Sequence, residues 1–388
     1  MIAHWGSTMI DVFNGFWHYA VPFLVVLTVL VFVHEYGHYW VARRCGVRIE
    51  VFSFGMGPEV WGWNDREGTR WRLSLLPLGG YVKMFGDAGA ASTPAEGLDE
   101  MTPEQKAVSF HHQTLPRRAA IVAAGPIANF LLAVVVLALL FMTAGQPYTP
   151  ADIGTVRPGS AAEAAGLVPK DIIVAIDGRA IERFEDVRSV VSVAPGQRLV
   201  LTIERAGNRM TLTATPQSST TTDHLGTSHT VGVLGITPRL GLDQRRQEDP
   251  MTAIWQAVSE TWNITAATLT GVSQMITGDR GTDDLGGPLR IAQMSGEVAQ
   301  AGFVHLILFL AVLSINLGLI NLFPIPLLDG GHLLFYGCEA ILGRPLGERT
   351  QEYGFRIGLA LVLSLMVFAT WNDLVHLRIV EFVRGLIS

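Results

Sequence analysis

Residues 21–44 read VPFLVVLTVLVFVHEYGHYWVARR, an apolar stretch long enough to cross a membrane that carries His34, Glu35 and His38 in its second half. Histidines four residues apart lie on one face of a helix, so both imidazoles can reach one zinc ion, and the glutamate beside the first can act as a general base. Polar residues are costly inside a bilayer unless they pair or bind something. The stretch therefore predicts metallopeptidase chemistry within a membrane-spanning helix, and hydrogen bonding to neighbouring helices is the plainer alternative.

The composition indicates a polytopic α-helical membrane protein with one water-soluble insert. The 388 residues are 49% hydrophobic and 16% charged, and the mean hydropathy is +0.34. A net charge of -6 without a basic stripe gives no support for nucleic-acid binding. The two cysteines, Cys45 and Cys338, are expected on the cytoplasmic side, where no structural disulfide is needed.

Four stretches are apolar enough to form transmembrane helices, at about residues 21–42, 119–142, 303–323 and 357–371. The loop between the first two is rich in Arg and Lys, whereas the segment before the first has neither. Because basic residues collect in the cytoplasm, we expect both termini to face outward and this loop to face inward. No basic residue precedes the first stretch and no small-residue cleavage site follows it, so we expect a retained helix rather than a signal peptide.

The pattern divides the chain into seven segments, at residues 1–44, 45–116, 117–143, 150–240, 248–300, 303–334 and 335–388. In the second segment, short runs at 48–54, 69–75 and 80–85 predict a small cytoplasmic β-sheet against the membrane. This sheet either only packs there or offers an edge strand to an extended substrate. Residues 86–97 predict a linker, and residues 251–276 predict an amphipathic helix at the outer membrane surface.

Residues 150–240 predict a compact α/β module on the extracytoplasmic side, because they follow the second transmembrane helix. The expected elements are a helix near residues 184–193, a hairpin at 198–204 and 209–215, and a last strand at 231–236. The Ser/Thr-rich residues 216–229 predict a flexible insertion.

The third transmembrane stretch carries Asn316 and Asn321 and ends in NLFPIPLLDGGH, residues 321–332. Its prolines end or unwind the helix near the membrane, where irregular backbone persists only if it lines a protein cavity. A zinc hydrolase needs three protein ligands and one open position, so Asp329 is the best third candidate and His332 is its rival. Asn129, in the second transmembrane stretch, indicates either interhelical hydrogen bonding or a role beside the metal.

The motifs HEYGH at 34–38, GPIAN at 125–129 and NLFPIPLLDGG at 321–331 together resemble the site-2 protease family of intramembrane zinc metalloproteases. Within that family the chain is similar to the bacterial regulator-of-sigma-E protease group. The resemblance implies one zinc ion, with Glu35 as the catalytic residue and three ligands, His34, His38 and Asp329. The residues expected to hold substrate are Asn316, Asn321, Pro324 and Asn129. The module at 150–240 resembles a PDZ domain, but the best-known relatives carry two in tandem and this chain has room for one.

The resemblance implies an intramembrane metalloendopeptidase in a bacterial inner membrane. Its expected substrates are single-span membrane proteins, such as an anti-sigma factor after a first extracytoplasmic cut, and remnant signal peptides. Two other classes stay open on the sequence alone. A non-catalytic PDZ scaffold would use the module to tether extracytoplasmic tails, and a metal transporter would use the intramembrane polar residues as a pathway.

Overall fold

The computed structural model describes residues 2–89, 95, 97–181, 183–222, 228–239, 244–246, 249–278 and 286–376. The chain forms two compact units. The first unit comprises residues 1–139, 254–275 and 280–388, and the second comprises residues 140–253 and 276–279. Part of the predicted linker at 86–97 lies outside the described residues.

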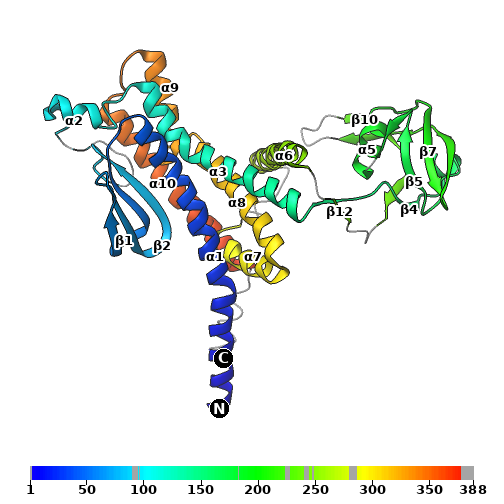
Figure 1. Cartoon of the computed structure of the whole chain (residues 1–388), viewed down its shortest axis with the longest axis horizontal. Coiled ribbons are helices and arrows are strands. Elements are labelled where there is room, and N and C mark those ends of the chain that lie inside the picture. The colour runs from blue at the N-terminus through cyan, green and yellow to red at the C-terminus, as the bar shows by residue number, and fades with distance from the viewer. Residues whose placement is uncertain are drawn as a thin grey trace. The chain divides into compact units, whose positions relative to one another are not determined.

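The first unit consists mainly of helices (Figure 1). They are α1 (Ile2–Arg44), α2 (Pro103–Val108), α3 (Leu115–Thr143), α6 (Pro250–Thr277), α7 (Pro288–Ala301), α8 (Phe303–Leu322), α9 (Asp329–Leu342) and α10 (Glu348–His376), with a 3-10 turn at Leu98–Glu100. In the part of the chain that the structure describes, four candidate transmembrane helices are long and apolar enough to cross a membrane: Trp17–Arg44, Leu115–Thr143, Phe303–Leu322 and Arg349–Val375. They agree with the four predicted stretches, and the last begins earlier than expected. Within the described residues, α6 does not meet this criterion.

Helix α1 packs against α8 through side chains that are apolar in both helices. Val26 and Leu30 of α1 are buried against Leu310 of α8. Helix α7 contacts α1, α8 and α10, and Gly296 of α7 lies directly against Tyr19 of α1. These contacts hold the half of α1 that carries His34 within a helical bundle.

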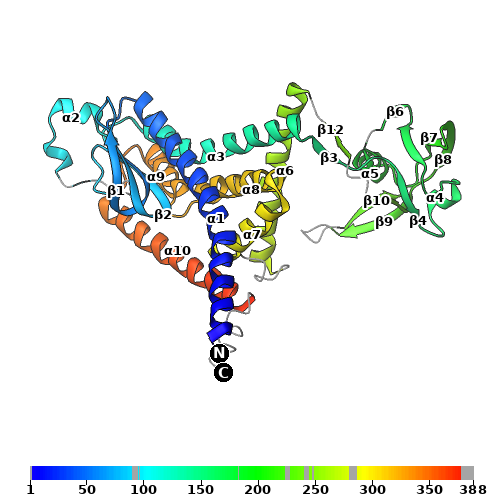
Figure 2. The ribbon, with the colours of Figure 1, turned by 60° about the horizontal axis from the view of Figure 1, so that its bottom comes forward.

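Strands β1 (Ile49–Asn64) and β2 (Arg70–Met84) form one small sheet beside the C-terminal half of α1 (Figures 1 and 2). Residues 51–54 have partners on both sides, in 70–73 and in 80–83, while residues 59–64 pair with 70–74. The sheet therefore has edges at 59–64 and at 76–84. The three short predicted strands are in fact two longer, bent ones. Gly55, Gly57 and Gly79, with φ of 84°, 91° and 89°, let the chain bend without leaving the sheet.

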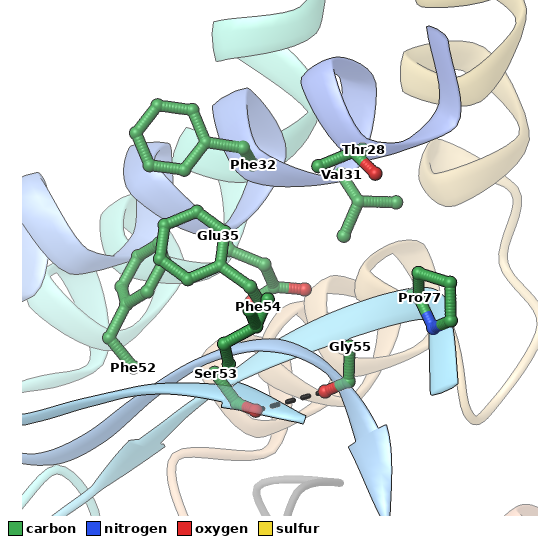
Figure 3. A pocket seen from close by; sticks show the side chains of 11 residues that line it. Thr28, Val31, Phe32, Glu35, Phe52, Ser53, Phe54, Gly55 and Pro77 are labelled. Atoms are coloured by element: carbon green, nitrogen blue, oxygen red, sulfur yellow. Dashed lines mark hydrogen bonds between the residues drawn. The ribbon is translucent and has the colours of Figure 1, made fainter. Parts of the chain in front are cut away.

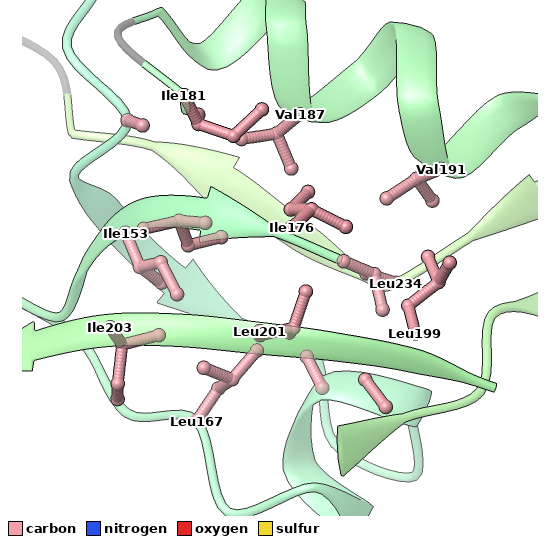
Figure 4. Packing of buried hydrophobic residues seen from close by; sticks show 14 of the residues in the cluster. Ile153, Leu167, Ile176, Ile181, Val187, Val191, Leu199, Leu201, Ile203 and Leu234 are labelled. Carbon is pink, nitrogen blue, oxygen red and sulfur yellow. The ribbon is translucent and has the colours of Figure 1, made fainter. Parts of the chain in front are cut away.

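The second unit is built on a four-stranded sheet with the order β6-β5-β7-β8. Its elements are β3 (Gln146–Tyr148), β4 (Ile153–Val156), α4 (Ala161–Ala164), β5 (Ile172–Ile176), β6 (Arg179–Ala180), α5 (Phe184–Ser192), β7 (Leu199–Arg205), β8 (Asn208–Ala214), β9 (Gln217–Thr222), β10 (Ser228–Val233), β11 (Ile236–Pro238) and β12 (Gln244–Arg246). Figure 4 shows its core, in which the buried side chains of Ile176 and Leu201 lie beneath Val187 and Val191 of α5.

Two strand predictions in this unit were wrong. The Ser/Thr-rich segment contains β9, which pairs with β10, so residues 217–222 are a strand and not a flexible insertion. The last strand is also interrupted, because Gly235 has a φ of 81° and separates β10 from β11. Thr is enriched in strands, and the high Ser content of the segment concealed its pairing.

Candidate metal centre

Three potential metal ligands from two distant helices converge inside the first unit. The Nε2 atom of His34 lies 3.1 Å from Oδ2 of Asp329, and the Nε2 atom of His38 lies 3.5 Å from the same oxygen. The two Nε2 atoms are 3.2 Å apart. Among the described residues, Oδ2 is buried and has no hydrogen-bond donor. Three lone-pair atoms therefore face one point, which is the arrangement a cation requires.

The orientation of His38 is fixed by the backbone of α3. Its Nδ1 donates a hydrogen bond to the carbonyl oxygen of Ile121 over 2.9 Å. In the neutral imidazole this leaves Nε2 with a free lone pair toward Asp329. Gly125, one turn further along α3, has no room for a side chain, because a Cβ there would overlap the His38 ring. A glycine at this position lets α3 approach close enough to hold the ligand.

Asn129 approaches His34 from the opposite side of the ring. Its amide Nδ2 lies 3.2 Å from Nδ1 of His34, and the side chain is completely buried. The backbone oxygen of Asn129 accepts a hydrogen bond from the Ser314 hydroxyl of α8 at 2.8 Å. This placement differs from the expected role in holding substrate, because the Asn129 side chain is a partner of a candidate ligand and is closed to solvent.

Asp329 reaches the two histidines because it is the first residue of α9. The segment between α8 and α9 folds back under the first turn of α9, and a Cβ at Gly330 or Gly331 would overlap backbone atoms of residues 322–326. The two glycines therefore allow close packing within a helical turn and do not form a turn themselves. Leu327 has a φ of 112°, a conformation that costs a non-glycine residue about 1–3 kcal/mol unless its surroundings hold it.

His332, the rival ligand, faces a different part of the unit. Its ring lies 5.3 Å from the ring of Phe355 and lines a cavity with Arg118, Tyr336 and Glu339. Arg118 pairs with Glu339 at 2.6 Å in that cavity. Among the described residues, the cluster able to hold a metal contains Asp329 and not His332.

The other residues expected to hold substrate do not belong to this cluster. Asn316 accepts a hydrogen bond from the Thr268 hydroxyl of α6 over 3.0 Å. Asn321 donates to the carbonyl oxygen of Leu317 in its own helix at 3.0 Å, and Pro324 is exposed in the segment after α8.

Glu35 lines a cavity between α1 and the sheet, as Figure 3 shows. The wall of the sheet is formed by residues 52–55 of β1, while Phe32 and Val31 contribute from α1. A Cβ built on Gly80 would lie 2.9 Å from Val31 and 3.3 Å from Glu35, so the edge strand 76–84 passes directly beside Glu35. The candidate base thus lies beside an edge of this sheet.

Sequence reasoning missed three features of the centre: the carbonyl of Ile121, the hydroxyl of Ser314 and the steric role of Gly125. A backbone carbonyl has no sequence signal. The small residues Ala124, Gly125 and Ala128 do indicate a close helix contact, but they do not indicate which residue lies opposite.

Two imidazoles and a carboxylate are the donor set of zinc hydrolases, and a glutamate beside them completes the usual constellation. The fold and the site together define the class as membrane-embedded zinc metalloproteases.

Comparison with known proteins agrees with this class. A family profile for Peptidase family M50 matches residues 22–365. The chain belongs to this family. A protein of Agrobacterium fabrum whose name describes it as a zinc metalloprotease is 48% identical over 92% of this chain and 95% of its own. Protease RseP of Yersinia pestis is 34% identical over 90% of this chain and 97% of its own. A PDZ domain of an SdrC-like protein from Listeria monocytogenes is 18% identical, covers 24% of this chain and 90% of that chain, and has a TM-score of 0.19.

The predicted family, the predicted enzyme class and the predicted zinc cofactor are thereby confirmed. The chain is a membrane protein and a zinc metalloprotease.

Proposed function

We propose that the chain is an intramembrane zinc metalloendopeptidase that cleaves the transmembrane segments of single-span membrane proteins. The observation that carries this proposal is the convergence of His34, His38 and Asp329, within 4.8 Å of one another, among helices apolar enough to span a membrane. The convergence of two imidazoles and a carboxylate beside Glu35 favours a hydrolytic centre over a pathway for ions.

In this proposal His34, His38 and Asp329 would hold the zinc ion, and the chemistry it would supply is activation of a water and polarisation of the substrate carbonyl. Glu35 takes the proton from the attacking water and returns it to the nitrogen of the leaving amine. Asn129 and the carbonyl of Ile121 orient the two histidine rings from outside.

A transmembrane substrate must be unwound before cleavage, because a helix hides its carbonyl groups in its own hydrogen bonds. The edge strand 76–84 can pair with an extended substrate and replace those bonds. Its passage beside Glu35 supports this assignment. Asn316, Asn321 and Pro324, near the end of α8, would contact the same unwound segment from the other side. Since Asn316 is bonded to Thr268 of α6, substrate has to replace that contact.

The expected setting is a bacterial inner membrane, with the sheet on the cytoplasmic side and both termini and the second unit outside. Candidate substrates are an anti-sigma factor trimmed by a first extracytoplasmic cut and remnant signal peptides. In the second unit, a groove of about 430 Å³ lies between α5 and residues 232–236, the position of a peptide groove in a PDZ-like domain. It supports either peptide capture or steric gating by that unit.

The test combines zinc content with cleavage of a single-span substrate, on wild type beside Glu35→Gln and Asp329→Asn. We expect one zinc ion per chain, loss of cleavage in both variants, and weakened zinc binding only in Asp329→Asn. Normal cleavage by Glu35→Gln would refute the assigned base. A folded wild type that holds no zinc and cleaves nothing would favour the non-catalytic PDZ scaffold.

A further inference from the structure

The cavity that Glu35 lines has a size and a lining that restrict what can enter it. Its volume is about 30 Å³. A cavity of this size has room for a side chain of only a few non-hydrogen atoms. Ala, Cys and Val side chains have no more than three such atoms, whereas Leu and Phe have more.

Three phenylalanine rings form part of the wall of the cavity, together with Val31, Leu73 and Pro77. The rings of Phe32 and Phe54 are stacked with centroids 5.3 Å apart and an interplanar angle of 11°. Phe52 lies 5.3 Å from Phe54 and is completely buried in the core beneath the sheet. The wall is therefore supported from behind and cannot move aside without disturbing that core.

The Ser53 hydroxyl, a polar group of the cavity besides Glu35 and Thr28, is already paired. The Ser53 hydroxyl donates to the carbonyl of Gly55 at 2.9 Å and accepts a hydrogen bond from Nε of Arg72 at 3.1 Å. Thr28 lies on the exposed side of α1. A side chain that enters the cavity thus contacts mainly apolar surface, so an apolar side chain is favoured there.

The position of Glu35 fixes which substrate residue the cavity receives. A general base lies within hydrogen-bond reach of the proton that it abstracts, so the attacked carbonyl is close to Glu35. The side chains within reach of the cavity are then those on either side of the scissile bond.

We propose that this cavity is a side-chain subsite that selects a small apolar residue, such as Ala, Cys or Val, at one side of the scissile bond. The inference rests on the proposed function and specifies its substrate class. Phe54, which is only partly buried, is the residue that limits the size of the subsite.

The experiment uses the full-length protein with a panel of single-span substrates in which each residue flanking the mapped bond is changed in turn to Ala, Leu and Phe. At one of the two positions, Leu and Phe should lower the initial rate by about tenfold or more relative to Ala. Phe54→Ala should raise the rates for the Leu and Phe substrates, relative to the Ala substrate, by about tenfold. Cleavage sites are mapped in every product, and a shift that brings a small residue to the same position also supports the subsite.

Trp61→Ala is the matched control, because it removes an exposed aromatic ring from the opposite edge of the same sheet and should leave the preference unchanged. Zinc content reports whether Phe54→Ala is folded. Phe32→Leu is a second variant, which removes fewer atoms from the same wall. An unchanged preference in both variants refutes the subsite. A wild type that cleaves all three substrates equally refutes the subsite but leaves the proposed function standing, whereas a wild type that cleaves none refutes the proposed function.

Discussion

Asn129 links a candidate zinc ligand to the helical bundle through a single buried amide. Its Nδ2 faces Nδ1 of His34, while its Oδ1 is buried with no partner among the described residues. A histidine that offers Nε2 to zinc carries its proton on Nδ1 and needs an acceptor there. A half-turn of the amide about its last side-chain bond presents Oδ1 to that proton. In that orientation Oδ1 of Asn129 accepts a hydrogen bond from Nδ1 of His34, so both of these groups have a partner when zinc is bound.

This role predicts that Asn129→Leu weakens zinc binding by about 10–100-fold, since the partner that orients His34 is lost. Asn129→Asp keeps an acceptor and should retain more of the affinity. Competition with a chelator of known affinity measures the dissociation constants. Asn321→Ala is a suitable control, because the hydrogen bond of that amide among the described residues is to Leu317 of its own helix. Wild-type zinc affinity in Asn129→Leu would contradict the assignment.

At the scale of elements, α7 is held in place by a carboxylate from another helix. Asp373, near the end of α10, accepts hydrogen bonds from the backbone N–H groups of Gly287, Leu289 and Arg290 at 2.8–3.1 Å. It is almost completely buried. The free N–H groups and the dipole at the start of a helix favour a carboxylate there. Helix α10 therefore caps α7, which in turn packs on α1.

Replacing Asp373 by Ala should cost about 1–3 kcal/mol of local stability, because buried N–H groups lose their acceptor. The expected result is faster hydrogen exchange in the first turn of α7, measured by mass spectrometry in the full-length protein. Glu352→Gln, at an exposed i,i+4 pair of the same helix, should leave exchange in α7 unchanged. Equal exchange in Asp373→Ala and wild type would show that the cap contributes nothing.

At the scale of the whole molecule, the second unit has its own core, and its stability depends on pH through a buried carboxylate. The Asp171 side chain is fully buried, and Arg205 binds it through Nε at 2.7 Å and Nη2 at 2.8 Å. Burial opposes ionisation, but the hydrogen bonds from Arg205 and from the N–H of Val168 outweigh it and lower the pKa of Asp171. This carboxylate therefore stabilises the unit in its charged form.

Because the folded pKa of Asp171 lies below its unfolded value of about 3.9, the stabilisation is fully present above roughly pH 4. It is lost as the pH falls through the folded pKa. Hydrogen-exchange protection of β5 and β7 at neutral pH should fall by about tenfold in Asp171→Asn, and the difference from wild type should disappear at low pH. A difference that persists unchanged at acidic pH would point to packing and not to charge.

The sequence alone predicted the four candidate transmembrane helices, because long apolar runs can span a membrane, and the candidate ligand pair of α1, because histidines four residues apart share a helix face. The resemblance of its three motifs to known proteases indicated the family. The sequence also led to Asp329 through the chemistry of a third ligand, although it could not exclude His332. Whether a side chain on a distant helix faces the histidines depends on how the segment after α8 folds back, and no local pattern contains that information.

Only the tertiary structure decided that Asn129 turns toward His34, that Gly125 makes room for His38, and that Asp373 caps α7. Each of these depends on which helices touch and at what distance, and short-range periodicity does not specify that. The same reason explains the strand found at residues 217–222, where pairing with β10 overrode a composition typical of a loop. The sequence thus specified which chemistry the chain carries, and the packing of distant segments specified which residues support it.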